Sequence, residues 1–211
     1  MSLPPVRPEL LAAALAARLI HDISGPASGI TSGLELYADA DLPDLRDQAL
    51  DLATSSSRSL LDLLDFCRLA YGGAGETQDG RTLENLARTP FAGRRCRLVW
   101  LIPEQPFNGP SAQALLILLQ IAAAGLASGG EARASASVQH DGVVLAVEGE
   151  GPRLRFPLEI IDGLAGLPLS EGLPGRWAPA GYLHGLVAAA GGRLTARIEP
   201  TAFRLEVSLP P

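Results

Sequence analysis

The N-terminal third of this chain repeats apolar side chains at the spacing of an α-helix, and no other feature constrains the fold as strongly. Two such stretches, residues 8–37 and 44–71, flank residues 38–43, which we predict to be a tight turn. Two long helices joined by a short turn form an antiparallel hairpin. The apolar face of the first helix is made of Leu11, Leu15, Leu19, Ile23, Pro26, Ile30, Leu34 and Tyr37.

Further apolar residues lie outside the faces that pair within this hairpin. They are Ile20, Leu36, Leu50, Leu61 and Phe66. Self-association of two hairpins into a four-helix bundle would cover them, so we predict a symmetric homodimer. The alternative is that the C-terminal part of the same chain covers the second face.

Glycine ends the helical pattern. The segment GGAGE at residues 72–76 interrupts it, so we predict one domain over residues 1–74 and a second over residues 75–211. The second domain mixes helical and strand patterns, which gives an α+β fold in which the helical hairpin precedes an α/β sandwich. The predicted helices are residues 80–92 (opened by Thr82), 110–128, 158–164 and 179–190, the predicted strands are residues 96–102, 132–139, 143–148, 153–157, 193–198 and 202–209, and residues 167–178 are predicted to be a loop.

Composition excludes several classes of function. The net charge of −6 and the pI of about 5.1 disfavour nucleic-acid binding. We expect no membrane span, because no uninterrupted apolar run reaches about 18 residues. The first residues, Met-Ser-Leu-Pro-Pro, lack the pattern of a signal peptide, so we expect a cytoplasmic protein. The two cysteines, Cys67 and Cys96, show no metal or redox spacing.

His21 is the candidate functional residue of the first helix. It lies two residues from both Leu19 and Ile23, about 200° around the helix axis, so it should point to solvent. Asp22 follows His21 directly. The residues three, four and seven positions from His21 are small except for one arginine. These neighbours are Ala14, Ala17, Arg18, Ser24, Gly25 and Ser28. The histidine is either an ordinary surface residue or a group placed for a partner protein to approach.

The first helix is weakened just after His21. Pro26 removes one backbone donor and crowds the carbonyl group of Asp22, so we predict a kink there. Gly25, Gly29 and Gly33 weaken this half further, each by up to ~1 kcal/mol relative to alanine. The helix should therefore depend on tertiary packing.

Two parts of the sequence resemble known signalling domains. A His-Asp pair with a proline five positions after the histidine, here His21, Asp22 and Pro26, resembles the dimerisation and phosphotransfer domain of sensor histidine kinases. The C-terminal half resembles the kinase ATP-binding domain in outline. Its apolar helix, residues 115–127, takes the place of the asparagine-bearing helix, and residues 144–151 take the place of the Asp-x-Gly-x-Gly turn. Residues 181–192 resemble the closing glycine motif.

The nucleotide chemistry of that kinase domain is missing. Gln120 and Ala124 occupy the positions nearest to the magnesium-holding asparagine. Glu148 replaces the adenine-binding aspartate, and Glu150 beside it would repel a triphosphate. A degenerate ATP-binding domain behind an intact histidine helix resembles a bacterial histidine phosphotransferase of the ChpT type. That family is dimeric, does not bind ATP and relays phosphoryl groups between receiver domains.

The resemblance implies a mechanism and partners. His21 would take a phosphoryl group from the receiver domain of a hybrid histidine kinase and pass it to the receivers of response regulators. Asp22 would orient the imidazole or accept its proton. The chain would hold no cofactor or metal, because the receiver brings the Mg²⁺, and it would bind neither nucleic acid nor membrane. The receiver would dock on Ala17, Arg18, Ser24, Gly25 and Ser28, with Arg18 offsetting the charge of the phosphoryl group.

Two other functions stay open on the sequence. The chain could be an active histidine kinase with a diverged ATP site, or a non-enzymatic dimeric adaptor in which His21 has no chemical role. ATP binding or autophosphorylation separates the first from a phosphotransferase. His21→Gln separates the second, because an adaptor would tolerate it.

Overall fold

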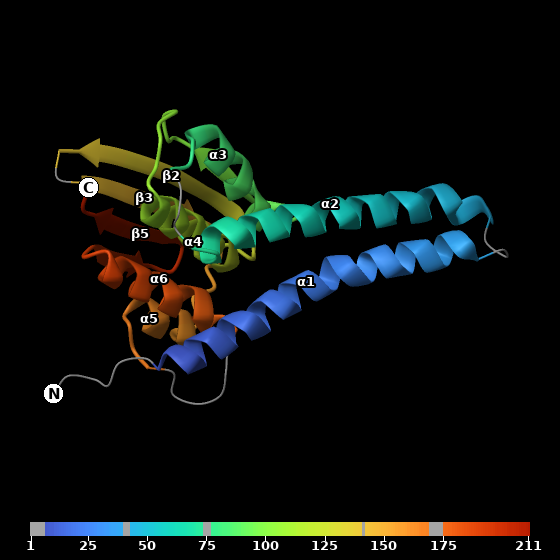
Figure 1. The fold of residues 1–211 in the computed structure, drawn as a ribbon, viewed down its shortest axis with the longest axis horizontal. Coiled ribbons are helices and arrows are strands. Elements are labelled where there is room, and N and C mark those ends of the chain that lie inside the picture. The colour runs from blue at the N-terminus through green and yellow to red at the C-terminus, as the bar shows by residue number, and fades with distance from the viewer. Residues whose placement is uncertain (1–6, 40–42, 74–76, 141, 169–174) are drawn as a thin grey trace.

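A computed structural model of the chain describes all residues except 1–6, 40–42, 74–76, 141 and 169–174. Its N-terminal part consists of two long helices, α1 (Pro8–Ala38) and α2 (Arg46–Tyr71), with a short 3₁₀ helix, η1 (Pro43–Leu45), before α2. Figure 1 shows α1 and α2 antiparallel and reaching away from the rest of the molecule. The predicted hairpin is therefore present, although residues 40–42 of its predicted turn lie outside the described residues.

Glycines on α1 allow α2 to come close. Gly33 is buried, and a Cβ atom there would lie 2.7 Å from the carbonyl oxygen of Ala49 and 2.9 Å from the Cβ of Ala53. A Cβ atom on Gly29 would overlap the side chain of Ser56. The sequence suggested only that these glycines weaken the helix, whereas the structure shows that they make its contact with α2 possible.

The C-terminal part is a five-stranded sheet in the order β1-β2-β3-β5-β4. β1 and β2 are parallel, and the other neighbouring strands are antiparallel. The helices pack on one face of this sheet (Figure 1), so the α+β fold of a helical hairpin and an α/β sandwich is confirmed. The strands are β1 (Cys96–Trp100), β2 (Gly130–Gln139), β3 (Gly142–Glu150), β4 (Arg193–Ile198) and β5 (Ala202–Leu209), and the helices are α3 (Gly80–Arg88), η2 (Thr89–Phe91), α4 (Gly109–Gly125), α5 (Leu158–Leu164) and α6 (Trp177–Ala189).

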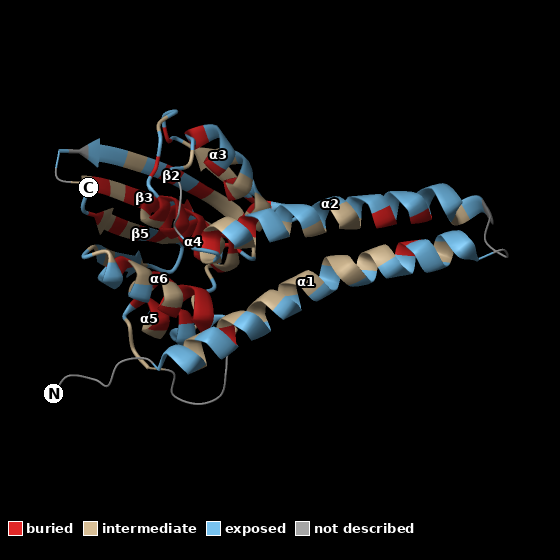
Figure 2. Ribbon diagram, viewed as in Figure 1, coloured by how far each residue is buried: buried red, intermediate tan, exposed pale blue. Residues whose placement is uncertain are grey.

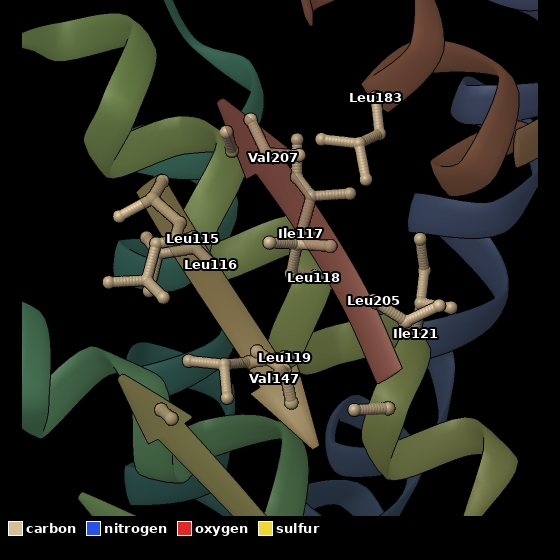
Figure 3. Packing of buried hydrophobic residues seen from close by; sticks show 14 of the residues in the cluster. Leu115, Leu116, Ile117, Leu118, Leu119, Ile121, Val147, Leu183, Leu205 and Val207 are labelled. Atoms are coloured by element: carbon tan, nitrogen blue, oxygen red, sulfur yellow. The ribbon is translucent and has the colours of Figure 1, made fainter. Parts of the chain in front are cut away.

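The helix α4 forms the centre of the core. Its charge-free sequence has no polar face, and all its residues from Ser111 to Leu119 are buried. Figure 3 shows side chains of α4 such as Ile117 and Leu118 next to Val147, Leu205 and Val207 of the sheet. Burial is concentrated here, while the distal hairpin is mostly exposed or half-buried (Figure 2).

Several predicted boundaries change. Residues 153–157 form no strand, and the backbone N–H of Arg155 donates to the carbonyl of Gly125. Helix α6 begins at Trp177, within the predicted loop, because Trp177 is buried and anchors the first turn. Helix α3 is capped by Asp79, whose carboxylate accepts from the backbone N–H of Thr82, so Thr82 does not open it.

The C-terminal part covers some of the apolar surface of the hairpin. Phe66 and Ala70 of α2 are buried in the same core as Leu83 and Leu115. For Phe66, the alternative that the C-terminal part of the same chain covers the second face holds, because the last turns of α2 pack into the C-terminal core. Ile20, Leu50 and Leu61 remain 49–66% exposed.

Candidate functional site

His21 is exposed, as its helical position predicts. Its side chain is 81% accessible, whereas Leu19 and Ile23 on either side are half-buried. Helical geometry explains this difference, because residues two apart lie on opposite sides of a helix. The imidazole is therefore open to a macromolecular partner.

Asp22 and Arg18 lie directly beside the imidazole. One carboxylate oxygen of Asp22, Oδ1, is 3.1 Å from Nδ1 of His21, and the other, Oδ2, accepts a hydrogen bond of 2.7 Å from Nε of Arg18. A carboxylate accepts hydrogen bonds, so this contact assigns the proton of a neutral imidazole to Nδ1. The lone pair is then on Nε2, and no described residue hydrogen-bonds to that atom.

Small, exposed residues lie near His21 on the surface of α1. Ala17, Ser24, Gly25 and Ser28 are all exposed. The hydroxyl of Ser24 donates to the carbonyl of Ile20, which keeps it close to the helix. A Cβ atom on Gly25 would meet nothing within 4 Å. Four of the five predicted docking residues are therefore exposed, whereas Arg18 is half-buried and bonded to Asp22.

Ala14, a predicted neighbour of His21, is not exposed. Ala14 is fully buried in a small cluster with Trp177 and Ala178 of α6, so it does not belong to the open surface around His21. The sequence could not show this, because the pattern of α1 does not reveal that α6 packs on its N-terminal half.

Helix α1 continues through Pro26. The preceding residue is glycine, which lacks the Cβ atom that would meet the proline ring in a helical conformation. Figure 1 shows that the two halves of α1 do not follow one straight line. The Gly25-Pro26 pair thus explains how the helix continues past the proline, and a kink located at Pro26 stays a prediction.

Behind Asp22, a polar network joins α2 to α4. The hydroxyl of Tyr71 donates to Oε1 of Gln120, and the Tyr71 ring packs edge-on against Tyr182. Burial raises the pKa of the Tyr71 hydroxyl far above its ordinary value, and the nearby Cys67 adds to this. Burial, and then the charge of Asp22, raises the pKa of Cys67 to about 11. Gln120 is thus engaged by a side chain of the hairpin.

The two glutamates predicted beside a nucleotide site lie elsewhere. Glu148 and Glu150 alternate with Val147 and Gly149 on β3 and lie on the exposed face of the sheet, away from α4. Glu148 forms an ion pair with Arg204. The expectation that Glu148 and Gln120 share one degenerate site was therefore wrong, because strand alternation places Glu148 on the other face.

A cleft of about 570 Å³ separates the hairpin from the C-terminal helices, and sequence reasoning missed it. Arg18 and Asp22 line it from α1, and Gln120 lines it from α4. Apart from Arg18, its basic residues come from segments that show no periodic pattern, so no sequence signal placed them together. The charged residues lining the cleft are Arg18, Asp22, Asp62, Arg94, Arg155 and Arg176.

Neither a metal cluster nor a membrane helix is found in the described parts of the chain. No group of three or more His, Cys, Asp or Glu side chains there could hold a metal ion. No helix within those parts is both long and apolar enough to span a bilayer.

Comparison with known proteins identifies the class. The family model described as the histidine phosphotransferase C-terminal domain matches residues 80–202, more than half of the chain. The chain therefore belongs to the histidine phosphotransferase family. The match runs from the start of α3 to the first residue of β5 and does not include the hairpin that carries His21.

Two relatives extend the similarity to nearly the whole chain. The protein phosphotransferase ChpT of Brucella abortus (strain 2308) is 28% identical over 219 residues, which cover 98% of this chain and all of the relative. A solved structure of a bacterial phosphotransferase superposes with a TM-score of 0.83 at 24% identity and covers 98% of this chain and all of that one. The resemblance to phosphotransferases of the ChpT type is thus confirmed, and the fold is shared along the full length.

Proposed function

We propose that this chain relays phosphoryl groups between the aspartates of receiver domains through His21, and that it does so without binding ATP. The observation that carries the proposal is the geometry at His21. The ring is exposed, its Nδ1 is held by Asp22, and no described residue hydrogen-bonds to its Nε2. Membership of the histidine phosphotransferase family supports the reaction class.

The first step is a displacement at phosphorus. The Nε2 lone pair attacks the aspartyl phosphate of the incoming receiver, the N–P bond forms, and the bond from phosphorus to the carboxyl oxygen breaks. The receiver aspartate leaves as a carboxylate. The ring gains positive charge, which the Asp22 carboxylate at Nδ1 offsets or relieves by accepting the proton. Transfer to a second receiver reverses these steps.

Docking supplies most of the catalysis in this proposal. Phosphoryl transfer depends mainly on positioning and charge stabilisation. The small exposed residues Ala17, Ser24, Gly25 and Ser28 allow the rim of a receiver to reach Nε2. The Mg²⁺ comes with the receiver, and the chain itself supplies the imidazole and the carboxylate.

We also propose that the chain is a cytoplasmic homodimer that pairs through its hairpin. Within one chain, Ile20, Leu50, Leu61 and Leu64 remain 43–66% exposed on α1 and α2. A large exposed apolar surface on a monomer marks an interaction site. Light scattering after gel filtration should give twice the chain mass, and Ile20→Ser with Leu61→Ser should lower it to one chain mass. A monomeric wild type would contradict the dimer.

One labelling experiment tests the proposed reaction. A receiver carrying radiolabelled aspartyl phosphate is mixed with the wild type or with His21→Gln. Label should move to the wild type as an alkali-stable phosphohistidine and stay on the receiver with the variant. A parallel reaction with γ-labelled ATP and no receiver should give no labelled chain. Labelling by ATP alone would identify a histidine kinase instead, and no transfer in either reaction would favour an adaptor.

A further inference from the structure

The ion pair between Arg18 and Asp22 is covered much more than the histidine beside it. The side chains of Arg18 and Asp22 are 24% and 19% exposed, whereas His21 is 81% exposed. The two oxygens of Asp22 are divided between two partners, Oδ2 to Arg18 at 2.7 Å and Oδ1 to His21 at 3.1 Å. The carboxylate therefore connects a partly buried guanidinium to an open imidazole.

Arg18 is itself held by the C-terminal part of the chain. Gly175, which precedes α6, lies over its aliphatic stem, so that a Cβ atom on Gly175 would be 3.5 Å from Cδ and 3.6 Å from Cβ of Arg18. One turn earlier, Ala14 packs on Trp177. Arg18, a residue of α1, is thus held against the segment that leads into α6.

The charge of Arg18 is already engaged. Among the residues that the structure describes, Asp22 is the only carboxylate within ion-pair distance of Arg18, and the bond uses Nε. A guanidinium committed to a neighbouring carboxylate is poorly placed to neutralise a phosphoryl group beyond the exposed ring. The expected role of Arg18, to offset phosphoryl charge directly, does not agree with this geometry.

We propose that Arg18 is a positioning residue for the phosphotransfer reaction. It holds the Asp22 carboxylate so that Oδ1 stays on Nδ1 of His21 and Nε2 is presented to the receiver. Arg18 acts through Asp22 and touches neither the imidazole nor the phosphoryl group. This inference rests on the proposed function, because it assigns a role within that reaction.

The physical reason lies in the mobility of an exposed imidazole. A surface histidine turns freely about its side-chain bonds and exchanges its proton between two nitrogens. A carboxylate that accepts from Nδ1 selects one tautomer and one ring orientation. An aspartate on an open helix surface also moves freely, so it can direct the ring only when a second contact holds it. Arg18 provides that contact.

The test compares Arg18→Met, which keeps the stem against Gly175 but removes the charge and the donors, with Arg18→Lys. The control, Arg193→Met, removes the same charge from the exposed edge strand β4. Proton–nitrogen correlation NMR of the unphosphorylated proteins, at a pH where the imidazole signals no longer move, reports the tautomer of His21. The His21 signals are assigned from their loss in His21→Gln. Single-turnover transfer from a phosphorylated receiver gives the rate.

The wild type and the control should show mainly the Nδ1–H tautomer of His21. Arg18→Met should show a mixture of tautomers and transfer about 10- to 100-fold more slowly, the scale expected for a misplaced reacting group. Arg18→Lys should restore part of both. Unchanged His21 signals in Arg18→Met would overturn the inference, as would equal changes in Arg193→Met.

The two readouts separate this inference from the proposed function. If the wild type accepts no label while Arg18→Met still disturbs the His21 tautomer, Arg18 does orient the His21 ring but the phosphotransfer function fails. If label moves normally in Arg18→Met and the tautomer is unchanged, the function stands and the positioning role fails.

Discussion

The helices α1 and α4 are opposites within one chain. Helix α1 has 31 residues, of which only Ala14 and Gly33 are buried. Helix α4 has 17 residues, of which 14 are buried. The candidate reactive group lies on the helix that contributes least to the core, and the helix at the centre of the core carries no candidate catalytic group.

The contrast between α1 and α4 corresponds to two different requirements, which are an accessible histidine and a stable core. Under the proposed function, His21 has to be reachable by other proteins, and α1 leaves its side chain exposed. The C-terminal part supplies the stability that such a helix lacks and contacts α1 beside the site, through Trp177 and Gly175. Under the proposed function, the sandwich would act on the reaction by supporting the hairpin.

The largest effect should come from the core of α4. Leu118 is fully buried, so Leu118→Ala should lower the free energy of unfolding by about 2–5 kcal/mol through lost burial and the cavity left behind. Urea denaturation followed by circular dichroism measures it. Leu158→Ala is the matched control, because Leu158 is 67% exposed and should change stability by less than ~0.5 kcal/mol. Equal losses in both would contradict the central place of α4.

The next effect concerns the approach of α1 to α2. Gly33→Ala should destabilise the protein by about 1–3 kcal/mol, because its Cβ would collide with the backbone of Ala49 and Ala53. Gly185→Ala, in the middle of α6 with open space around the new Cβ, should instead stabilise by up to ~1 kcal/mol. Thermal unfolding of both variants gives the signs. A stabilising Gly33→Ala would mean that the helices are further apart than described.

These glycines also show how far sequence reasoning reaches. The periodicity and the breaks at residues 38–43 and 72–76 predicted both long helices, and alternation predicted four strands closely, because both signals are local. The packing of α6 on Ala14 and the cleft with Arg94, Arg155 and Arg176 depend on contacts between distant segments. The exposure of His21 could be expected from spacing, and the role of Asp22 beside it from the family resemblance. The bond from Arg18 to that carboxylate was not predicted, although the two residues are four apart on the helix, a spacing at which side chains meet.

A smaller effect is expected at the junction between the hairpin and the sandwich. Tyr71→Phe removes the hydrogen bond to Gln120 and should cost about 1 kcal/mol, the usual net value for one such bond. Tyr37→Phe serves as the control, because Tyr37 is 46% exposed near the far end of α1. Chemical denaturation of the two variants provides the comparison. A Tyr71→Phe protein as stable as the control would show that this bond does not hold the two parts together.

The smallest effect is a pH dependence from Cys67. Its folded-state pKa of about 11 exceeds the ordinary value of 9.0, so the unfolded chain releases this proton first as the pH rises. Stability from this thiol is therefore complete below pH 9 and is lost as the pH rises toward 11. Between pH 8 and pH 10, the wild type should lose unfolding free energy more steeply than Cys67→Ala. Parallel or reversed slopes would contradict the burial of this thiol beside Asp22.

The relay itself is tested most directly by a chase. The chain is labelled at His21 by a phosphorylated receiver, separated from it, and mixed with an unphosphorylated receiver of a response regulator and Mg²⁺. The account predicts that label leaves His21 and appears on the aspartate of the second receiver, and that free phosphate is not the main product. Label that stays on the chain, or that was never on His21, would contradict it.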